Sequence, residues 1–441
     1  MLKKINNNGN ISQIATKFQG RKTNVSEEVN QIVQNIVDDI RAKGDEALFD
    51  YAKKLDGYKL TKENLTVTPA ERVAGLEKID PDYLRILQRA KKQIEEFHKH
   101  QLGNSWTTYK ENGVIMGQIA RPLERVALYV PGGTAAYPST VIMNAVPALL
   151  AGVEDLVIIT PVKADGLVNP NILAAAEVCG ISTIYKVGGA QAVAAVAYGT
   201  SSIPKVDKIV GPGNLFVATA KKICYGIVDI DMIAGPSEVL IIADEYANPK
   251  YVAADLMAQA EHDKLASAIL VTTSEKLVVL VNKELDRQVK SLERREIIES
   301  SIENYGGAIL VDTLDEAFEV SNQLAPEHLE ILTQDSLAQL PKVKNAGSIF
   351  LGEYTPEPLG DYMSGSNHVL PTGGTAKFYS GLGVYSFVKY STFSYYPKAI
   401  LATFKDDVEA FAESEGLTAH ANSIAVRFDE ADEAKNTNKG E

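Results

Sequence analysis

The stretch RVALYVPGGTAAYPSTVIMNAVPALLAGVEDLVIITPV, residues 125–162, has the pattern of a parallel α/β sheet. Its short apolar runs at 125–130 and 155–162 are bounded by turn residues, so they are predicted to be strands. The segment between them begins with two glycines and continues as a helix through Ala151. Strand, glycine turn, helix and strand form the unit from which parallel sheets with helices on both faces are built.

The same unit repeats further along the chain. Two more apolar runs, STIYKV at 182–187 and DKIV at 207–210, each lead through glycines into a helical stretch. A second series of short apolar runs begins with EVLIIAD at 238–244 and ends with GSIFLG at 347–352. The alternation predicts two α/β modules joined near residues 230–238. Within the second series we expect a helix at about 250–262 and further runs at 268–273, 307–312 and 315–323.

The part of the chain before the first module has a helical pattern. Apolar residues recur every three or four positions from Val29 to Ile40, and Gly44 marks the end of that helix. Pro81 opens a second amphipathic helix, which ends before Gly103. We therefore expect helical pieces outside the two modules.

The composition of the 441 residues is that of a globular protein. Apolar residues make up 45% and charged residues 23%, and the formal net charge is -13. Such an acidic chain lacks the basic surface that nucleic acids require. The most apolar stretch, 135–162, is interrupted by prolines and acidic residues before it reaches the roughly 20 residues of a spanning helix. We expect neither a nucleic-acid partner nor a membrane span.

Cysteine use indicates a reducing compartment. The chain has two cysteines, Cys179 and Cys224, which are too few for a disulfide framework, and its start, MLKKINNNGN, lacks the apolar run of a signal peptide. A cytoplasmic location is therefore expected. Neither cysteine has a base beside it in the sequence, so both are predicted to be structural rather than reactive.

Three of the predicted strand-to-helix turns carry glycine, at Gly132–Gly133, Gly188–Gly189 and Gly211–Gly213. Glycine lets backbone N–H groups approach a phosphate, and a helix N-terminus favours negative charge. None of the turns completes the dinucleotide fingerprint G-x-G-x-x-G, since GPGNLF has Phe216 at the third glycine position. The turns are either phosphate-binding or ordinary tight turns, and the sequence leaves both interpretations open.

Histidine is scarce, with six copies in the chain. His98 and His100 lie at the end of a charged amphipathic helix, where a cation would complement the helix dipole, so we expect both on the surface. The other four stand in polar strings beside carboxylates and amides, and they are His262, His328, His368 and His420. These four are the candidates for chemistry.

Two of these strings pair histidine with another functional side chain. Gln259 and His262 are three apart on a predicted helix, so both project from one face and could hold one metal, or they could form a polar helix end. Glu327 and His328 follow a proline, which could present two proton-transfer groups on a rigid loop, or they could begin a capped helix. Neither pair is decisive by itself.

The last two strings are loop-like. GDYMSGSNHVLPTGG places Asp361 after a glycine and His368 among turn residues. EGLTAHANS places Glu415 and His420 on either side of Gly416, outside any clear amphipathic pattern. Both strings are candidates for ligand binding, because polar side chains in loops are free to face a ligand.

At these strings the sequence resembles the histidinol dehydrogenase family. The resemblance covers residues from about Thr23 to Val426, and its motifs occur in the order of the family. They are YVPGGTAAYPSTVIMNAVPALLAGV, KVGGAQAVAAVAYGT, DKIVGPGN, AGPSEVLIIAD, AQAEHD, LAPEHLEI, GDYMSGSNHVLPTGGTAKF and EGLTAHANS. So many dispersed motifs discriminate far better than any one of them.

The resemblance implies a role for individual residues. The catalytic pair would be Glu327 and His328. One Zn²⁺ per subunit would be held by Gln259, His262, Asp361 and His420. Histidinol would contact the same four side chains together with Ser237, His328 and Glu415. NAD would contact Tyr129, Gln191 and Asn214.

The resemblance also implies a fold, which is α/β with two incomplete Rossmann-like parallel-sheet domains, small helical terminal domains and an intertwined homodimer. Residues 1–24 would form a helical dimerisation segment. The first α/β domain, with the zinc and catalytic residues, would comprise 25–125 and 238–380, and the second, on the NAD side, 126–237. The C-terminal domain would be 381–441, reaching the site of the neighbouring subunit and ending in a disordered tail at 431–441.

These residue types suit the oxidation of an amino alcohol to an amino acid. Histidinol carries an imidazole and an amine, which can complete the shell of a zinc ion that keeps open positions. His328 would take the hydroxyl proton as hydride leaves for NAD, because histidine titrates near neutral pH. Glu327 would activate water on the aldehyde before a second hydride transfer, and a cysteine thiohemiacetal is the rival that we consider less favoured.

Two other functions remain open from the residues alone. A zinc hydrolase would use Glu327 to activate water and would need no NAD. A non-catalytic metal- or solute-binding protein could use the same two-module frame. Formation of reduced nicotinamide during turnover separates the dehydrogenase from both.

Overall fold

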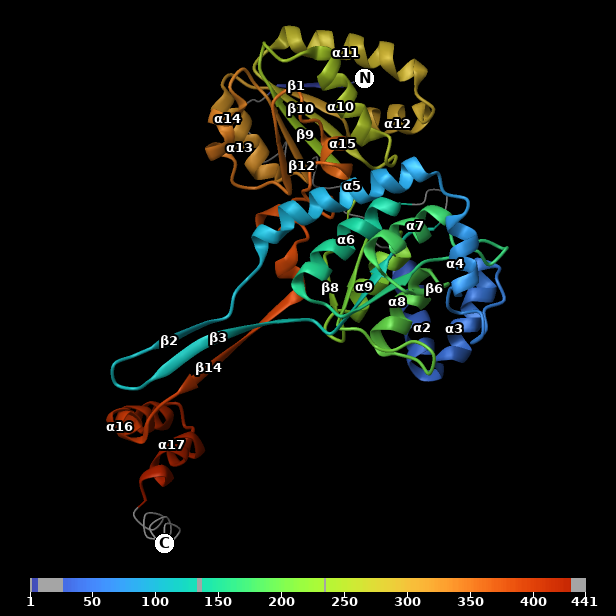
Figure 1. Ribbon diagram of the computed structural model, residues 1–441. Coiled ribbons are helices and arrows are strands. Elements are labelled where there is room, and N and C mark those ends of the chain that lie inside the picture. Colours follow the sequence, from blue (N-terminus) through green and yellow to red (C-terminus); the bar gives the residue numbers. More distant parts are fainter. Residues whose placement is uncertain (1, 7–26, 133–136, 234, 430–441) are drawn as a thin grey trace. The chain divides into compact units, whose positions relative to one another are not determined.

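The computed structural model describes residues 2–6, 27–132, 137–233 and 235–429 (Figure 1). The chain divides into two compact units. The first comprises Met1–Leu102 and Pro122–Phe387, and the second comprises Gly103–Arg121 and Val388–Glu441. Among the described residues, no helix is both long enough and apolar enough to cross a lipid bilayer.

The first unit contains a five-stranded parallel sheet in the order β6-β5-β4-β7-β8. Its strands are β4 (Arg125–Tyr129), β5 (Asp155–Ile159), β6 (Thr183–Tyr185), β7 (Lys208–Val210) and β8 (Asp229–Ile230). The helices that follow the first four are α6 (Pro138–Ala151), α7 (Pro170–Cys179), α8 (Gly189–Tyr198) and α9 (Leu215–Cys224). The predicted strand, turn and helix repeats are therefore confirmed.

Both faces of this sheet are covered by helices and buried. One face packs α6 and α7 with α5 (Pro81–His98), and the other packs α8 and α9 with α2 (Glu27–Lys43). The predicted amphipathic helices are thus confirmed. Their apolar stripes, which include Val33 and Ile94, are fully buried because each stripe fits one face of the sheet.

This packing differs from the expected domain division. The resemblance implies that 25–125 belong to the domain of 238–380, yet α2 and α5 share hydrophobic cores with the five-stranded sheet. An amphipathic pattern predicts that the apolar face of a helix is buried, but it does not identify the sheet on which that face packs. The remaining short helices before residue 103 are α3 (Asp45–Tyr51), η1 (Ala52–Asp56), α4 (Pro69–Leu76) and η2 (Lys99–Gln101).

A six-stranded parallel sheet forms the rest of the first unit, in the order β1-β11-β10-β9-β12-β13. Its strands are β1 (Lys4–Asn6), β9 (Glu238–Ala243), β10 (Ser267–Thr272), β11 (Gly307–Leu310), β12 (His328–Leu332) and β13 (Ser348–Leu351). The helices are α10 (Pro249–Ala260), α11 (Glu275–Gln288), η3 (Val289–Ser291), α12 (Arg295–Tyr305), α13 (Leu314–Leu324), α14 (Ser336–Gln339), η4 (Leu340–Lys342), α15 (Glu357–Tyr362), η5 (Thr375–Lys377) and η6 (Val384–Phe387). Two separate hydrophobic cores lie on its faces.

Two features of this sheet differ from expectation. Part of the N-terminal segment expected to be helical is strand β1, which pairs with β11, while residues 7–26 lie outside the described residues. The string after Pro326 is neither a loop nor a helix start, because His328 is the first residue of β12. The run HLEIL is short and apolar enough for a buried strand. Glu330 at its centre interrupts the apolar run by which a buried strand is recognised in a sequence.

The second unit is built on a three-stranded sheet in the order β14-β3-β2. Strands β2 (Trp106–Tyr109) and β3 (Ile115–Pro122) form an antiparallel hairpin beside β14 (Val388–Tyr395), and the helices are α16 (Lys398–Ser414), α17 (Thr418–Ala425) and η7 (Val426–Phe428). Unlike the expected terminal domain of 381–441, this unit includes the hairpin and begins at Val388 on the C-terminal side. The expected disordered tail at 431–441 lies outside the described residues.

Candidate active site

A cavity of about 420 Å³ in the first unit is lined by residues from both parallel sheets. The five-stranded sheet contributes the turn Gly211–Asn214, which follows β7. The six-stranded sheet contributes residues that precede β9 and begin β12. The functional side chains that line the cavity are Ser237, Gln259, His262, Glu327, His328, Asp361 and His368.

The five-stranded sheet meets the cavity with the carboxyl ends of its strands. Strand β4 is followed on one side by β5 and on the other by β7, so the strand order reverses between β4 and β7. Doubly wound sheets bind ligands in the crevice at such a reversal. Tyr129 ends β4, and Asn214 caps the helix after β7 by accepting from the N–H groups of Phe216 and Val217 at 3.1 Å.

The six-stranded sheet meets the cavity with the opposite edge. His328 pairs with Val239 near the amino ends of β12 and β9, and Ser237 directly precedes β9. At the carboxyl edge of the same two strands, Asp244 accepts from the N–H of Gln334 at 2.8 Å. This hydrogen bond joins the segment that follows β9 to the segment that follows β12. A doubly wound sheet usually binds its ligand between two such segments. The chemistry-bearing residues therefore lie at the amino edge.

His328 is held as a neutral imidazole with one nitrogen free. Its Nδ1–H donates to the carbonyl oxygen of Glu238 at 3.0 Å, which fixes the tautomer. Its Nε2 is buried and has no hydrogen-bond partner among the described residues. Burial lowers the pKa of His328 to about 3, assisted by repulsion from His262 and His368. A neutral imidazole with an available lone pair is the form that accepts a proton.

Glu327 lies beside this imidazole and is oriented by the backbone. Its Oε2 accepts from the N–H of Glu238 at 2.9 Å and lies 3.7 Å from Nδ1 of His328. The side chain is 9% exposed and lines the same cavity. One carboxylate and one imidazole, both anchored to the start of β9, can therefore act on a common ligand.

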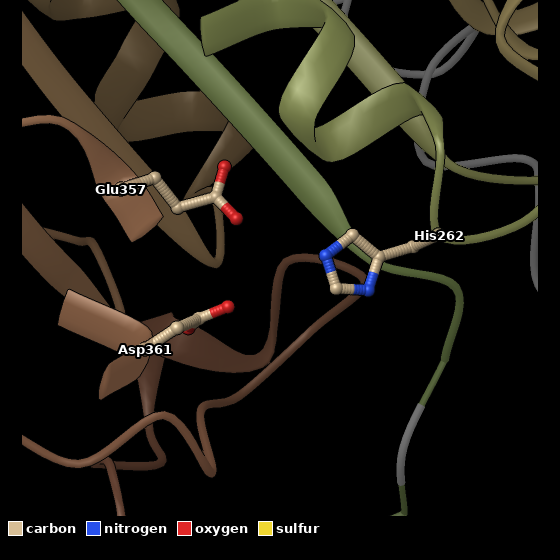
Figure 2. Close-up of side chains that lie close together, drawn as sticks. All are labelled: His262, Glu357 and Asp361. Atoms are coloured by element: carbon tan, nitrogen blue, oxygen red, sulfur yellow. The ribbon is translucent and has the colours of Figure 1, made fainter. Parts of the chain in front are cut away.

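A metal-ligand cluster lies next to this pair. His262 just beyond α10, and Glu357 and Asp361 on α15, have ligand atoms that all lie within 4.8 Å of one another. Figure 2 shows their side chains pointing toward a common space. Gln259 at the end of α10 joins them, since its amide nitrogen, when it faces Glu357, donates to the carboxylate oxygens at 3.1 and 2.9 Å.

Burial perturbs every ionisable member of the cluster. It raises the pKa of Asp361 to about 6 and that of Glu357 well above its usual range, where the charges of Asp361 and Glu327 add to the effect. Burial also lowers the pKa of His262. Neutral imidazole, amide oxygen and crowded carboxylates are a ligand set that a divalent cation would stabilise. The donor set thus fits the expected zinc ion.

The Gly211 turn is fixed by a buried ion pair, Lys221–Asp231, which no pattern in the sequence predicts. The Asp231 carboxylate accepts from the N–H of Gly211 at 2.7 Å, and the Lys221 ammonium group donates to the carbonyl oxygen of Gly211 at 2.9 Å. The Lys221 and Asp231 side chains also form an ion pair with each other. Gly211 has a φ of 109°, and a Cβ there would lie 2.2 Å from the carbonyl oxygen of Tyr129. Only glycine fits this close approach.

The other expected cofactor contacts lie along the same edge of the five-stranded sheet. The hydroxyl of buried Tyr129 accepts from the N–H of Gly189 at 3.1 Å, and the amide nitrogen of Gln191 donates to Asp56 at 3.2 Å. The Oε1 of Gln191 and the hydroxyl of Thr160 are buried without hydrogen-bond partners among the described residues. Unpaired buried polar atoms at a helix N-terminus and a strand end fit a polar ligand such as a dinucleotide.

The remaining candidates divide between the two units. His368 lines the cavity, and burial lowers its pKa to about 4. Glu415, which follows α16, and His420, in α17, both belong to the second unit and are exposed within it. Their participation in the site therefore stays a prediction.

His98 is buried, contrary to the prediction, whereas the two cysteines are buried as structural thiols are. His98 was expected on the surface but is 1% exposed, because it lies on the apolar side of α5, where its Nδ1 pairs with Gln101 at 2.8 Å. His100 is exposed as expected. Cys179 and Cys224 are buried, and burial raises the pKa of each to about 12, which suits structural and not nucleophilic thiols.

The fold and the site define an α/β enzyme with a candidate metal centre. Two parallel sheets contribute opposite strand ends to one cavity, which contains a glutamate–histidine pair beside a cluster of potential metal ligands. The profile of the family described as histidinol dehydrogenase matches residues 19–428. Histidinol dehydrogenases of Lactococcus lactis and Clostridium acetobutylicum are 80% and 55% identical over 98% and 93% of this chain, covering 100% and 96% of their own. The crystal structure of histidinol dehydrogenase from Elizabethkingia anophelis superposes with a TM-score of 0.91 at 37% identity, covering 98% of this chain and 99% of that one. This chain belongs to the histidinol dehydrogenase family.

Proposed function

We propose that the chain oxidises L-histidinol through L-histidinaldehyde to L-histidine, with zinc bound at the cluster and two NAD molecules as successive hydride acceptors. The observation that carries the proposal is the adjacency, in one cavity, of the pair Glu327–His328 and the ligand cluster around His262. Family membership supports the substrate. A cytoplasmic location and the absence of nucleic-acid and membrane partners complete the proposal.

The substrate would be held by its two nitrogen groups. Gln259, His262, Asp361 and the partner subunit's His420 would hold the zinc ion, which would supply a binding point for the nitrogen groups of the substrate and so help to orient the alcohol carbon. Ser237 and His328 line the same cavity and would contact the substrate from the six-stranded sheet. Glu415 of the partner subunit would contribute a further contact in a homodimer.

His328 would act in both oxidation steps. Its free Nε2 accepts the hydroxyl proton as hydride leaves the carbon for the nicotinamide ring. The aldehyde that results must gain water before it can lose a second hydride. Glu327 would take a proton from that water while protonated His328 returns its proton to the aldehyde oxygen, and the neutral imidazole would then accept the hydroxyl proton of the hydrate during the second transfer.

NAD would lie along the carboxyl edge of the five-stranded sheet, against Tyr129, Gln191 and Asn214. The strand-order reversal and the helix N-termini at this edge support the assignment. The same cavity contains the Gly211 turn and His328, so a nicotinamide at the turn would lie within the reach of the reacting carbon.

The proposal predicts that a strong chelator abolishes NAD reduction by histidinol and that added Zn²⁺ restores it. His262→Asn should weaken zinc retention by more than the roughly 10- to 100-fold typical for loss of an outer partner of a metal ligand. The measurement is absorbance of reduced nicotinamide alongside the zinc content. Full turnover by metal-free protein would contradict the zinc assignment, and no formation of reduced nicotinamide by the zinc-loaded protein would contradict the dehydrogenase reaction.

The Lys221–Asp231 pair predicts a specific effect on the cofactor. Lys221→Met removes the hydrogen bond to the Gly211 carbonyl, and a hydrogen bond to a charged group contributes about 1.5–3 kcal/mol. We expect the KM for NAD to rise at least about 10-fold, with zinc content and the KM for histidinol unchanged. Lys221→Gln, whose amide can still donate, should lose less.

A matched control separates this effect from loss of a lysine in the same sheet. Lys208 is also buried, and it pairs with Asp229 at 2.7 Å at the start of β7, the end opposite the turn. Lys208→Met should leave NAD affinity unchanged. Equal KM values for NAD in Lys221→Met, Lys208→Met and the unaltered protein would refute a role for the pair in cofactor binding.

A further inference from the structure

Glu357 is the member of the ligand cluster that the expected zinc ligands do not include. It is 1% exposed, the first residue of α15, and one helical turn before Asp361. Its own N–H donates to Oε1 of Glu330 on β12 at 2.8 Å. The residue is thus fixed at both ends, by Glu330 through its backbone and by Gln259 through its carboxylate. This arrangement links α15 and α10 to the strand that carries His328.

The orientation of the Gln259 side chain decides whether it can bind a metal. An amide presents a carbonyl oxygen on one side and an NH₂ group on the other, and only the oxygen is a ligand. One side of the Gln259 amide faces the two Glu357 oxygens, while the other side faces only hydrogen-bond donors. Both oxygens of the Glu357 carboxyl group lie within hydrogen-bond distance of this side of the amide, at 3.1 and 2.9 Å, and carboxylate oxygens are hydrogen-bond acceptors. The carboxylate thus attracts the nitrogen and leaves the oxygen on the other side.

The second neighbour on the Glu357 side supports neither orientation of the amide. Nδ1 of His328 lies 3.1 Å from the same position of the Gln259 amide. That nitrogen already donates its one hydrogen to the carbonyl of Glu238, so it neither donates to an amide oxygen nor accepts from an amide nitrogen. The Glu357 carboxylate is therefore the group on this side that selects the amide nitrogen.

We propose that Glu357 is a positioning residue that holds the Gln259 amide with its oxygen toward the metal. The inference rests on the proposed zinc site. Outer partners of metal ligands typically contribute 10- to 100-fold in metal affinity. Glu357→Leu should therefore raise the zinc dissociation constant by about 10- to 100-fold. Glu357→Gln, whose own carbonyl can still accept from Gln259, should have a smaller effect.

The decisive test replaces the amide by a group that has no wrong orientation. A carboxylate at position 259 presents an oxygen on both sides, so Gln259→Glu should abolish the dependence on Glu357. We would measure zinc dissociation constants by chelator competition in a double-mutant cycle of Glu357→Leu and Gln259→Glu. Glu357→Leu should weaken zinc binding in the Gln259 background. In the Gln259→Glu background it should not, and it should relieve the repulsion between the two carboxylates.

Glu261→Gln is the control for loss of negative charge, because Glu261 adjoins His262 and repels Glu357 without belonging to the cluster. It should leave zinc affinity within about twofold, as for a half-exposed charge. Equal loss on Glu357→Leu in both backgrounds, or unchanged zinc affinity in the single variant, would overturn the proposal. If the unaltered protein bound no zinc, the proposed function itself would fail, whatever Glu357 does.

Discussion

Replacing His328 by asparagine is expected to slow both oxidation steps by about 10²- to 10⁴-fold, the usual effect of removing a general base. Each step releases a proton from a hydroxyl as hydride departs, and the free Nε2 of His328 is the acceptor in both. Single-turnover rates of nicotinamide reduction from histidinol and, separately, from histidinaldehyde would measure the two steps.

Glu327→Gln should slow the second oxidation step much more than the first. The first oxidation needs no water, so its rate should be nearly kept, while aldehyde hydration and the second oxidation should slow by about 10²-fold or more. Equal loss on both substrates would contradict this division of labour. His98→Asn is the matched control, because His98 is also a buried imidazole with an unpaired Nε2 but does not line the cavity. It should leave both rates unchanged even if it lowers stability.

Activity is expected to return when two inactive variants are mixed, if His420 completes the site of the partner subunit. His262→Asn and His420→Asn would each be inactive alone. After joint unfolding and reassembly in equal amounts, about half of the dimers would be mixed. Each mixed dimer would have one doubly altered site and one with every native ligand, so activity should reach about a quarter of that of the unaltered protein.

The same experiment distinguishes a shared site from a site within one chain. If all four ligands came from one chain, every site in the mixture would lack a histidine and no activity would return. A mixture of His262→Asn with Asp361→Asn provides the control, because both residues lie in the cluster of one chain. That mixture should remain inactive. Recovery there, or none in the first mixture, would refute the shared site.

The α/β class and the repeated strand, turn and helix units could be predicted from the sequence, whereas the roles of the site residues stay predictions. Short apolar runs between glycine turns specify buried parallel strands, because backbone hydrogen bonding and side-chain burial act within a few residues. The dispersed motifs likewise name Gln259, His262, Glu327, His328 and Asp361, which the fold brings to one cavity. These are local signals, readable without knowing what the chain packs against.

Which helix packs on which sheet is known only from the folded structure. The stripe of α2 is evident in the sequence, but only packing assigns it to the five-stranded sheet. Glu357 lies in a proline-rich stretch that gave no helical signal, and Lys221 and Asp231 are ten residues apart, so no local pattern predicts their contacts. Glu330 makes β12 hard to recognise as a buried strand in the sequence, because a carboxylate is buried only where it finds hydrogen-bond partners. Here the N–H of Glu357 is such a partner, and it comes from a distant segment. Such roles depend on contacts between distant segments, and those contacts exist only once the chain has folded.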